Sequence, residues 1–297
     1  MKRILLYTLC LSLFITACNK DDHFKPGEPT VTAEAQTLKD VAYGSDNLQK
    51  MDVYLPANRS SATTKVFIFI HGGAWAEGDK ADADHAPLID SLRRRLPDWA
   101  IFNLNYRLAS LNGITLKNKF PAQEEDIKAA IRYIYDRRQT FTISDKWVFA
   151  GASAGAHLAL LQGYKNNGTI QPKAIIDLFG PNDMTALYNT YSSSDPGEAF
   201  LISLLLSGTP TNNAVMYHDS SPINYVTAQS APTIIFQGGL DDVVPKEQSY
   251  ALRDKLNNAG VKNQFVFYDN QTHGWSDPAI WYDCLNKAQN FINANVQ

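Results

Sequence analysis

Ser153 is the residue of this 297-residue chain whose neighbours best suit nucleophilic chemistry. It is the central residue of a G-A-S-A-G sequence at residues 151–155, which follows a short apolar run and precedes an apolar helical pattern. Only small side chains fit beside the apex of so tight a strand-to-helix turn, and the strained backbone there would expose the hydroxyl. A serine turn that merely begins a helix has the same composition. The nucleophile hypothesis therefore requires oxyanion donors, a histidine and an acid elsewhere in the chain.

A second group of small residues, H-G-G-A at residues 71–74, follows a strongly apolar run. Because bulky side chains are absent, the backbone N–H groups of Gly73 and Ala74 could approach a carbonyl oxygen, together with the N–H of Ala154. Such donors stabilise the negative charge that develops on that oxygen. A simple Gly-Gly turn after a strand is the alternative. We expect His71 to orient this loop rather than to transfer protons.

Two carboxylates and one histidine are the candidates for the acid and the base. Asp241 and Asp242 follow another apolar run, and either could face inward from its loop. His273 follows the last apolar run, and Gly274 leaves its ring accessible. Serine, acid and histidine then occur in the chain order that the G-x-S-x-G hydrolases require. His157 falls in the helix after the serine, where we expect packing rather than catalysis.

All these candidates directly follow apolar segments that predict strands. Predicted strands alternate with predicted helices, which indicates an α/β fold with a mostly parallel central sheet, helices on both faces and an antiparallel N-terminal hairpin. Ligand sites of such folds lie at the carboxyl ends of the strands. The expected strands are residues 41–44 and 49–56 (the hairpin), 65–70, 100–106, 147–150, 174–179, 233–236 and 264–268; the expected helices are residues 120–138, 154–161, 246–258 and 279–294.

Together these segments resemble the α/β-hydrolase superfamily, and within it the carboxylesterase branch that includes bacterial feruloyl and acetyl-xylan esterases. The H-G-G-A loop resembles the HGGG-type loop of esterases, and residues 238–245 resemble the G-x-x-D-x-x-V-P segment after the seventh strand. The resemblance implies Asp241 as the acid, with Asp242 as its competitor. The family usually has His before the first glycine of that segment, where this chain has Gln237. Because Gln237 lies outside the triad, we keep the assignment.

The resemblance covers the chain from about Leu38 onward and is specific for fold and triad rather than for substrate. It implies a serine esterase in which Ser153 attacks, His273 transfers the proton and Asp241 orients the imidazole. The expected substrates are short-chain acetyl or hydroxycinnamoyl (feruloyl) esters, on small molecules or on plant polysaccharide. A serine peptidase or amidase, a lipase, a formamidase and a non-enzymatic surface binding module are the alternatives.

Two tryptophans are expected near the mouth of the pocket. Trp75 follows the oxyanion loop and Trp275 follows His273, and flat aromatic faces there would suit a sugar or feruloyl ring. Packing against neighbouring loops is the alternative. Residues 181–231 are longer than a crossover connection needs, so they could form a lid or merely cover the sheet.

The first residues predict export and anchoring. Lys2 and Arg3 precede an apolar run too short to span a bilayer, and the I-T-A-C sequence that ends at Cys18 resembles the bacterial lipobox. We expect residues 1–17 to be a lipoprotein signal peptide, Cys18 to carry lipid such as palmitate, residues 18–37 to be a tether and residues 38–297 to be the hydrolase domain. The expected location is the outer membrane of the cell envelope, and the acidic residues after Cys18 favour the cell surface. A plain secretory signal is the alternative.

Charge and motif content argue against several other classes. A net charge of −3 gives no electrostatic case for nucleic-acid binding. No histidine pair or cysteine set has metal-ligand spacing, and no glycine-rich loop with Lys-Ser/Thr indicates a nucleotide. We therefore expect no metal, no cofactor and no membrane contact beyond the lipid anchor.

Overall fold

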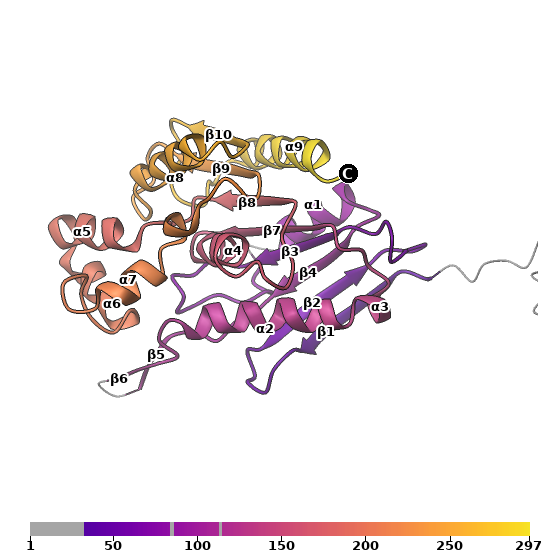
Figure 1. Cartoon of the computed structure of the whole chain (residues 1–297), viewed down its shortest axis with the longest axis horizontal. Coiled ribbons are helices and arrows are strands. Elements are labelled where there is room, and N and C mark those ends of the chain that lie inside the picture. Colours follow the sequence, from indigo (N-terminus) through magenta and orange to yellow (C-terminus); the bar gives the residue numbers. More distant parts are fainter. Residues whose placement is uncertain (1–32, 84–85, 113–114) are drawn as a thin grey trace, which may run out of the picture. The chain divides into compact units, whose positions relative to one another are not determined.

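An eight-stranded sheet forms the centre of the structure, a computed structural model that describes residues 33–83, 86–112 and 115–297. In spatial order its strands are β1 (Gln36–Ala42), β2 (Lys50–Leu55), β4 (Ala100–Leu104), β3 (Val66–Ile70), β7 (Trp147–Ala152), β8 (Ala174–Leu178), β9 (Thr233–Gly238) and β10 (Asn263–Tyr268). From β4 to β10 the strands run parallel, whereas β2 is antiparallel to both neighbours. The predicted α/β architecture with an antiparallel N-terminal hairpin is confirmed (Figure 1).

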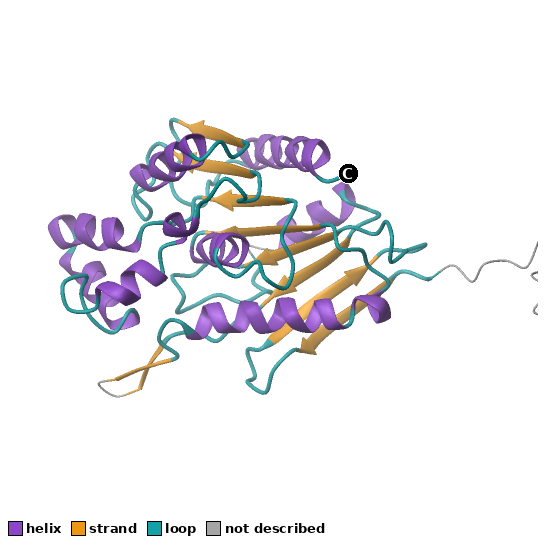
Figure 2. Cartoon of the chain, viewed as in Figure 1, coloured by secondary structure: helices purple, strands orange, loops and turns teal. Residues whose placement is uncertain are grey.

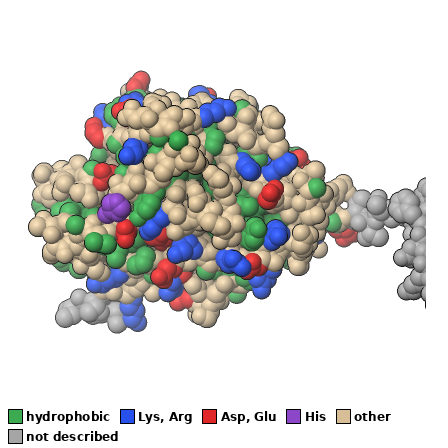
Figure 3. Space-filling view, in the orientation of Figure 1, with side chains coloured by type: hydrophobic (Ala, Val, Ile, Leu, Met, Phe, Trp, Pro, Cys, Tyr) green, Lys and Arg blue, Asp and Glu red, His purple; other side chains and the backbone are tan. Residues whose placement is uncertain are grey.

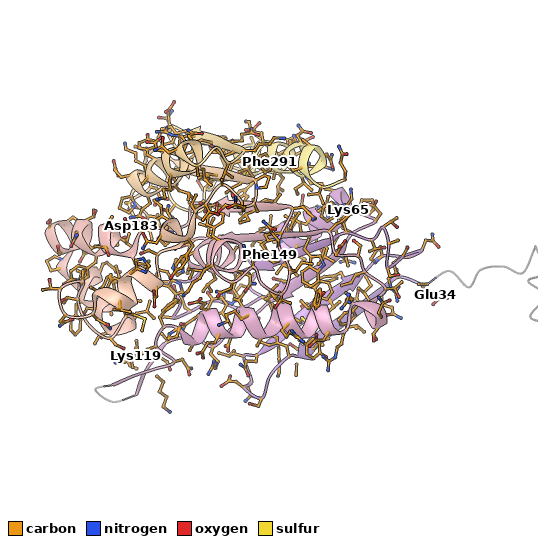
Figure 4. The ribbon with its side chains drawn as sticks, viewed as in Figure 1. Glu34, Lys65, Lys119, Phe149, Asp183 and Phe291 are labelled. Carbon is orange, nitrogen blue, oxygen red and sulfur yellow. The ribbon has the colours of Figure 1, made fainter. Side chains whose placement is uncertain are left out.

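Helices cover both faces of this sheet (Figure 2). One face packs against α2 (Ala122–Asp136), α4 (Ala154–Tyr164) and α8 (Lys246–Asn258), and the other packs against α1 (Ala86–Arg95) and α9 (Pro278–Asn295). Side chains of β3 alternate between them, because Ile68 belongs to the cluster with α2 and α4 while Phe67 belongs to the cluster with α1 and α9. Figure 4 labels one core residue of each face, Phe149 and Phe291. Coverage on both sides explains the uninterrupted apolar runs of the strands.

The first strand begins earlier than the sequence predicts. β1 starts at Gln36, which pairs with Leu55, although the domain was expected to begin at Leu38. Residues of this edge strand are mostly exposed, so they show none of the apolar alternation that marks a half-buried strand. The hairpin prediction is right, but its first strand begins at residue 36 rather than at residue 41.

The long segment between β8 and β9 forms three helices beyond one end of the sheet (Figure 1). They are α5 (Met184–Ser194), α6 (Pro196–Leu205) and α7 (Ala214–Asp219), followed by a short 3-10 helix at Pro222–Tyr225. Met184, Leu205 and Tyr217 are buried in the same hydrophobic cluster as Ile68 of β3. Phe200 and Leu201 of α6, by contrast, are exposed. One side of this insertion is therefore continuous with the core.

Several elements have no counterpart in the prediction. They are α1, α3 (Arg138–Phe141) and a small hairpin of β5 (Ser110–Asn112) and β6 (Thr115–Lys117). Among the described residues no helix is long and apolar enough to cross a bilayer. The predicted signal peptide and Cys18 lie outside the described residues. On the face shown in Figure 3, acidic and basic side chains are interspersed, with no continuous patch of either charge.

Candidate active site

Ser153 lies in the turn between β7 and α4. Its φ of 54° and ψ of −122° are unfavourable for a residue with a side chain, and such conformations cluster at functional sites. The Ser153 N–H donates to the carbonyl oxygen of Leu178 at 2.9 Å, which fixes the turn to β8. A Cβ on Gly151 would collide with the backbone of Gly155. The small residues of the motif are thus required by the geometry that exposes the serine.

The loop after β3 approaches Ser153 closely. A Cβ on Gly72 would lie 3.3 Å from the Ser153 Cβ. Gly73 and Ala74 have positive φ angles of 106° and 47°, and both line the same cavity as Ser153. Within the part of the chain that the structure describes, the N–H groups of Gly73, Ala74 and Ala154 form no hydrogen bond to another protein group. These donors are therefore available to a ligand oxygen, as the oxyanion prediction requires.

His71 is buried at the base of this loop. Its ring stacks on that of Tyr106 with centroids 4.4 Å apart, and its Nδ1 lies 2.7 Å from the carbonyl oxygen of Gly72. Tyr106 in turn donates its hydroxyl to the carbonyl oxygen of His71 at 3.1 Å. This arrangement fits the expected role of His71 in orienting the loop.

The structure contradicts the prediction that Trp75 lies at the pocket mouth. Trp75 is buried, does not line the cavity, and donates its indole N–H to His157 Nδ1 at 3.1 Å. Since an indole nitrogen only donates, His157 Nδ1 must be unprotonated, and Nε2–H donates to the carbonyl oxygen of Ser220 at 2.6 Å. Burial, with the charge of Lys165, lowers the pKa of His157 to about 4. Trp75 and the neutral His157 therefore hold the oxyanion loop against α4 and the insertion.

Replacing Trp75 by phenylalanine should destabilise the fold by about 1–3 kcal/mol, because His157 Nδ1 would stay buried without a donor. Urea unfolding measures the change. Trp99→Phe is the matched control, since Trp99 is equally buried and its indole N–H donates no hydrogen bond within the described chain. Equal destabilisation of the two variants would show that the indole hydrogen bond contributes nothing.

Asp241 and His273 meet after β9 and β10. The Asp241 side chain is fully buried, and its Oδ2 lies 2.9 Å from His273 Nδ1. Its Oδ1 accepts the N–H groups of Val243 and Val244 at 3.0 and 2.7 Å. An ionised carboxylate only accepts, so Nδ1 carries the proton and Nε2 is left to accept one from a hydroxyl. Asp242, the competing acid, is exposed.

Gln237 contributes to this site although the sequence reading gave it no role. Its Nε2–H donates to Asp241 Oδ2 at 3.0 Å, and its Oε1 accepts from the Ser249 hydroxyl at 2.7 Å. Gln237 is fully buried at the end of β9. The sequence could have indicated this role, because Gln237 directly precedes Gly238 and Gly239, at the end of a predicted strand where side chains reach the site.

Phe179 forms a wall of the site that the sequence reading also missed. Its ring meets that of His273 edge to face, with centroids 4.7 Å apart. Phe179 has a positive φ of 48°, and the turn is closed by the Gly180 N–H, which donates to the buried Asp177 at 2.8 Å. Burial raises the pKa of Asp177 from 3.8 to about 7.

This raised pKa predicts a pH-dependent stability. The folded state keeps the Asp177 proton up to about pH 7, while the unfolded chain releases it near pH 4. Unfolding free energy should therefore fall as the pH rises between these values. Asp177→Asn keeps the acceptor for the Gly180 N–H and cannot ionise. The difference in unfolding free energy between this variant and the natural protein should therefore shift in favour of the variant as the pH rises across this window. Denaturant titrations at several pH values measure it. The exposed Asp98→Asn is the control, and a pH-independent difference at Asp177 would contradict the assignment.

The serine and the histidine of the site line one cavity of about 950 Å³. Ser153, His273, Phe179 and Trp275 line it together with the oxyanion loop. Trp275 is almost entirely buried and packs edge to face on Phe179 with centroids 5.2 Å apart, so one side of its ring forms part of the wall. The prediction for Trp275 is compatible with this placement, unlike that for Trp75.

This arrangement can activate a hydroxyl and bind an oxyanion. In the described part of the chain no group of three or more His, Cys, Asp or Glu side chains is placed to hold a metal ion. The chemistry that these side chains can perform themselves is nucleophilic attack by Ser153 with general base assistance from His273.

Comparison with known proteins relates this chain to esterases. The family model BD-FAE matches residues 51–256. The chain is 28% identical to esterase LipC of Mycobacterium tuberculosis over 229 residues, which are 73% of this chain and 54% of LipC. It is also 28% identical to kynurenine formamidase of Meyerozyma guilliermondii over 226 residues, 72% of this chain and 78% of that protein. The chain thus spans about half the length of LipC.

Solved structures agree on the fold. A truncated form of a carbohydrate esterase from gut microbiota superposes with a TM-score of 0.69 at 25% identity, covering 86% of this chain and 96% of that one. The fold is that of the α/β-hydrolase esterases, as the sequence predicts.

Proposed function

Because the chain belongs to the BD-FAE family, we propose that it is a serine carboxylesterase with Ser153, His273 and Asp241 as its catalytic triad. One observation carries this proposal: His273 is bound through Nδ1 to the buried Asp241 in a cavity that Ser153 also lines. The esterase named among its relatives supports the reaction class. Asp241 rather than Asp242 is the acid, because Asp242 is exposed.

The reaction follows from the placement of these groups. The Ser153 hydroxyl attacks the ester carbonyl carbon while its proton passes to His273 Nε2. The N–H groups of Gly73, Ala74 and Ala154 bind the oxyanion that forms. Collapse of this intermediate breaks the bond to the alcohol oxygen, which takes the proton from His273 and leaves an acyl-enzyme. Water then attacks by the same route and releases the acid.

The proposed substrates are short acyl or hydroxycinnamoyl esters of plant polysaccharide. The similar carbohydrate esterase supports an ester on a sugar. A cavity of about 950 Å³ is far larger than an acetyl group and has room for part of the alcohol. Aromatic walls at Phe179 and Trp275 suit a flat ring.

A series of p-nitrophenyl esters, with acetylated and feruloylated xylan, tests this proposal. We expect release of acetate or ferulate from xylan and a steep fall in kcat/KM for acyl chains longer than butyrate. A strong preference for long-chain lipid esters without release from xylan would overturn the substrate class.

Hydrolysis of an N-formyl amide is the second candidate activity, which the similarity to kynurenine formamidase favours. The same triad can cleave either bond. Comparing kcat/KM for N-formylkynurenine and for p-nitrophenyl acetate decides between them. A higher value for N-formylkynurenine would replace the esterase proposal.

We further propose that a lipid on Cys18 anchors the domain, residues 38–297 by prediction, to the outer membrane. Glu34 lies on the side of the domain opposite the carboxyl ends of β7 and β8 (Figures 1 and 4).

Cys18→Ser should move activity from the membrane pellet to the soluble fraction. Two or three acyl chains hold a protein firmly on a bilayer, and without Cys18 none can be attached. Fractionation followed by an esterase assay measures the shift. Cys284→Ser is the control, because Cys284 is buried in α9. Membrane retention of the Cys18→Ser protein would rule the lipid anchor out.

A further inference from the structure

The catalytic cavity continues from the oxyanion loop into a groove between α1 and α9. Its walls beyond the catalytic residues are side chains of these two helices. They include Leu88, Ser91, Arg94 and Arg95 of α1 and Tyr282 and Leu285 of α9. We call this part of the cavity the α1–α9 groove. Arg94 and Arg95 lie about 10 Å along α1 from Leu88, at 1.5 Å per residue.

Arg95 is held in this groove by neutral groups. Its Nη1–H groups donate to Asn286 Oδ1 at 2.6 Å and to Gln289 Oε1 at 3.3 Å, and its Nε–H faces the Ser91 hydroxyl at 3.4 Å. Gln289 also donates its amide to the Arg95 carbonyl oxygen. The guanidinium is therefore half-buried and oriented, but none of these contacts neutralises its charge.

Neither Arg94 nor Arg95 has a carboxylate within 4.0 Å among the described residues, whereas Arg93 on the same helix pairs with Asp90 at 3.4 Å. Of the described residues that line the cavity, only Glu77 carries negative charge, and it follows the oxyanion loop. Basic residues in the last turn of a helix complement its dipole, but side chains in solvent would serve that purpose equally. Two cations without counterions on the wall of a catalytic cavity favour an anionic ligand.

Tyr282 supplies a surface for a ring beside these cations. It is 64% exposed, and the Arg95 Cζ lies 5.0 Å from its ring centroid. Amphipathic aromatic faces of this kind suit sugar rings, while the planar fork of an arginine binds a carboxylate through two hydrogen bonds.

We propose that the α1–α9 groove binds the distal part of the alcohol of the substrate, and that this part carries a carboxylate held by Arg94 and Arg95. The substrate class is an acylated oligosaccharide that bears a uronic acid some sugar units away from the ester. The inference rests on the proposed esterase function for its catalytic consequence, but binding in the groove can be measured without catalysis.

The kinetic test compares acetylated xylo-oligosaccharides of equal length with and without a uronic acid branch. The natural protein should prefer the acidic oligosaccharide, and this preference in kcat/KM should decline at high salt. Arg94→Gln should lower the ratio of acidic to neutral kcat/KM about tenfold, as expected for a lost charged hydrogen bond. Arg93→Gln is the matched control, because Arg93 is adjacent, exposed and outside the cavity, and should leave the ratio unchanged.

The binding test uses the Ser153→Ala protein and calorimetric titration with the same oligosaccharides. Tighter binding of the acidic one, weakened about tenfold by adding Arg94→Gln, would support the groove even if no ester were turned over. Equal affinity for both oligosaccharides would overturn the inference and leave the esterase proposal intact.

A lipid-facing role for the arginines gives a different result. In that case Arg94→Gln would weaken binding of the Cys18→Ser protein to phosphatidylglycerol vesicles while the acidic-to-neutral ratio stayed constant. This outcome would overturn the groove as a substrate site.

Discussion

Ester turnover should fall by roughly 10⁴-fold or more when Ser153 is replaced by alanine, with the fold unchanged. The hydroxyl is the group that forms the acyl-enzyme, and no neighbouring side chain in the turn could take its place. Alanine at position 153 can adopt the same positive φ in the turn between β7 and α4 at the same steric cost as serine. The unfolding midpoint should therefore stay within error of the natural value. Steady-state kinetics with p-nitrophenyl acetate measures the loss. Substantial turnover by a correctly folded Ser153→Ala protein would refute the mechanism.

Asp241→Asn should lower kcat by about 10⁴-fold, because an amide no longer stabilises the imidazolium or fixes the tautomer of His273. The structure provides a matched control one residue away. Asp242 has the same chemistry and charge but is exposed, so Asp242→Asn should change kcat less than twofold. Comparing the pH dependence of kcat/KM for both variants distinguishes loss of the catalytic acid from disruption of the loop that carries it. The reverse ranking would move the role of the acid to Asp242.

Much of the fold could be predicted because the strands are buried on both faces. Uninterrupted apolar runs such as residues 66–70 and 147–150 mark parallel strands, and the residues that follow such strands mark the catalytic edge. β1 lacked this signal, since most of its residues are exposed at the sheet edge and most of these are polar. Helix α1 was not predicted either, because only Ile89 and Leu92 of its residues are buried.

The site was less predictable wherever a contact joins residues distant in sequence. Trp75 was expected at the pocket mouth because it follows the oxyanion loop, but its N–H finds a buried acceptor on His157, 82 positions later. Gln237 was set aside as lying outside the triad, yet it donates to Asp241. The order of the candidate residues along the chain indicates which of them could be catalytic. The hydrogen-bond partner of a buried polar group, by contrast, depends on how the chain packs.

Stoichiometric labelling of Ser153 tests the central claim most directly. A fluorophosphonate probe phosphonylates an activated serine, whose oxygen displaces fluoride from phosphorus, and peptide mass spectrometry then identifies the residue that carries the probe. We predict one probe per chain, attached to Ser153, with loss of esterase activity in proportion to labelling and no label on the Ser153→Ala protein. Full activity after exhaustive exposure to the probe, or a label on another residue that accounts for the lost activity, would contradict the account.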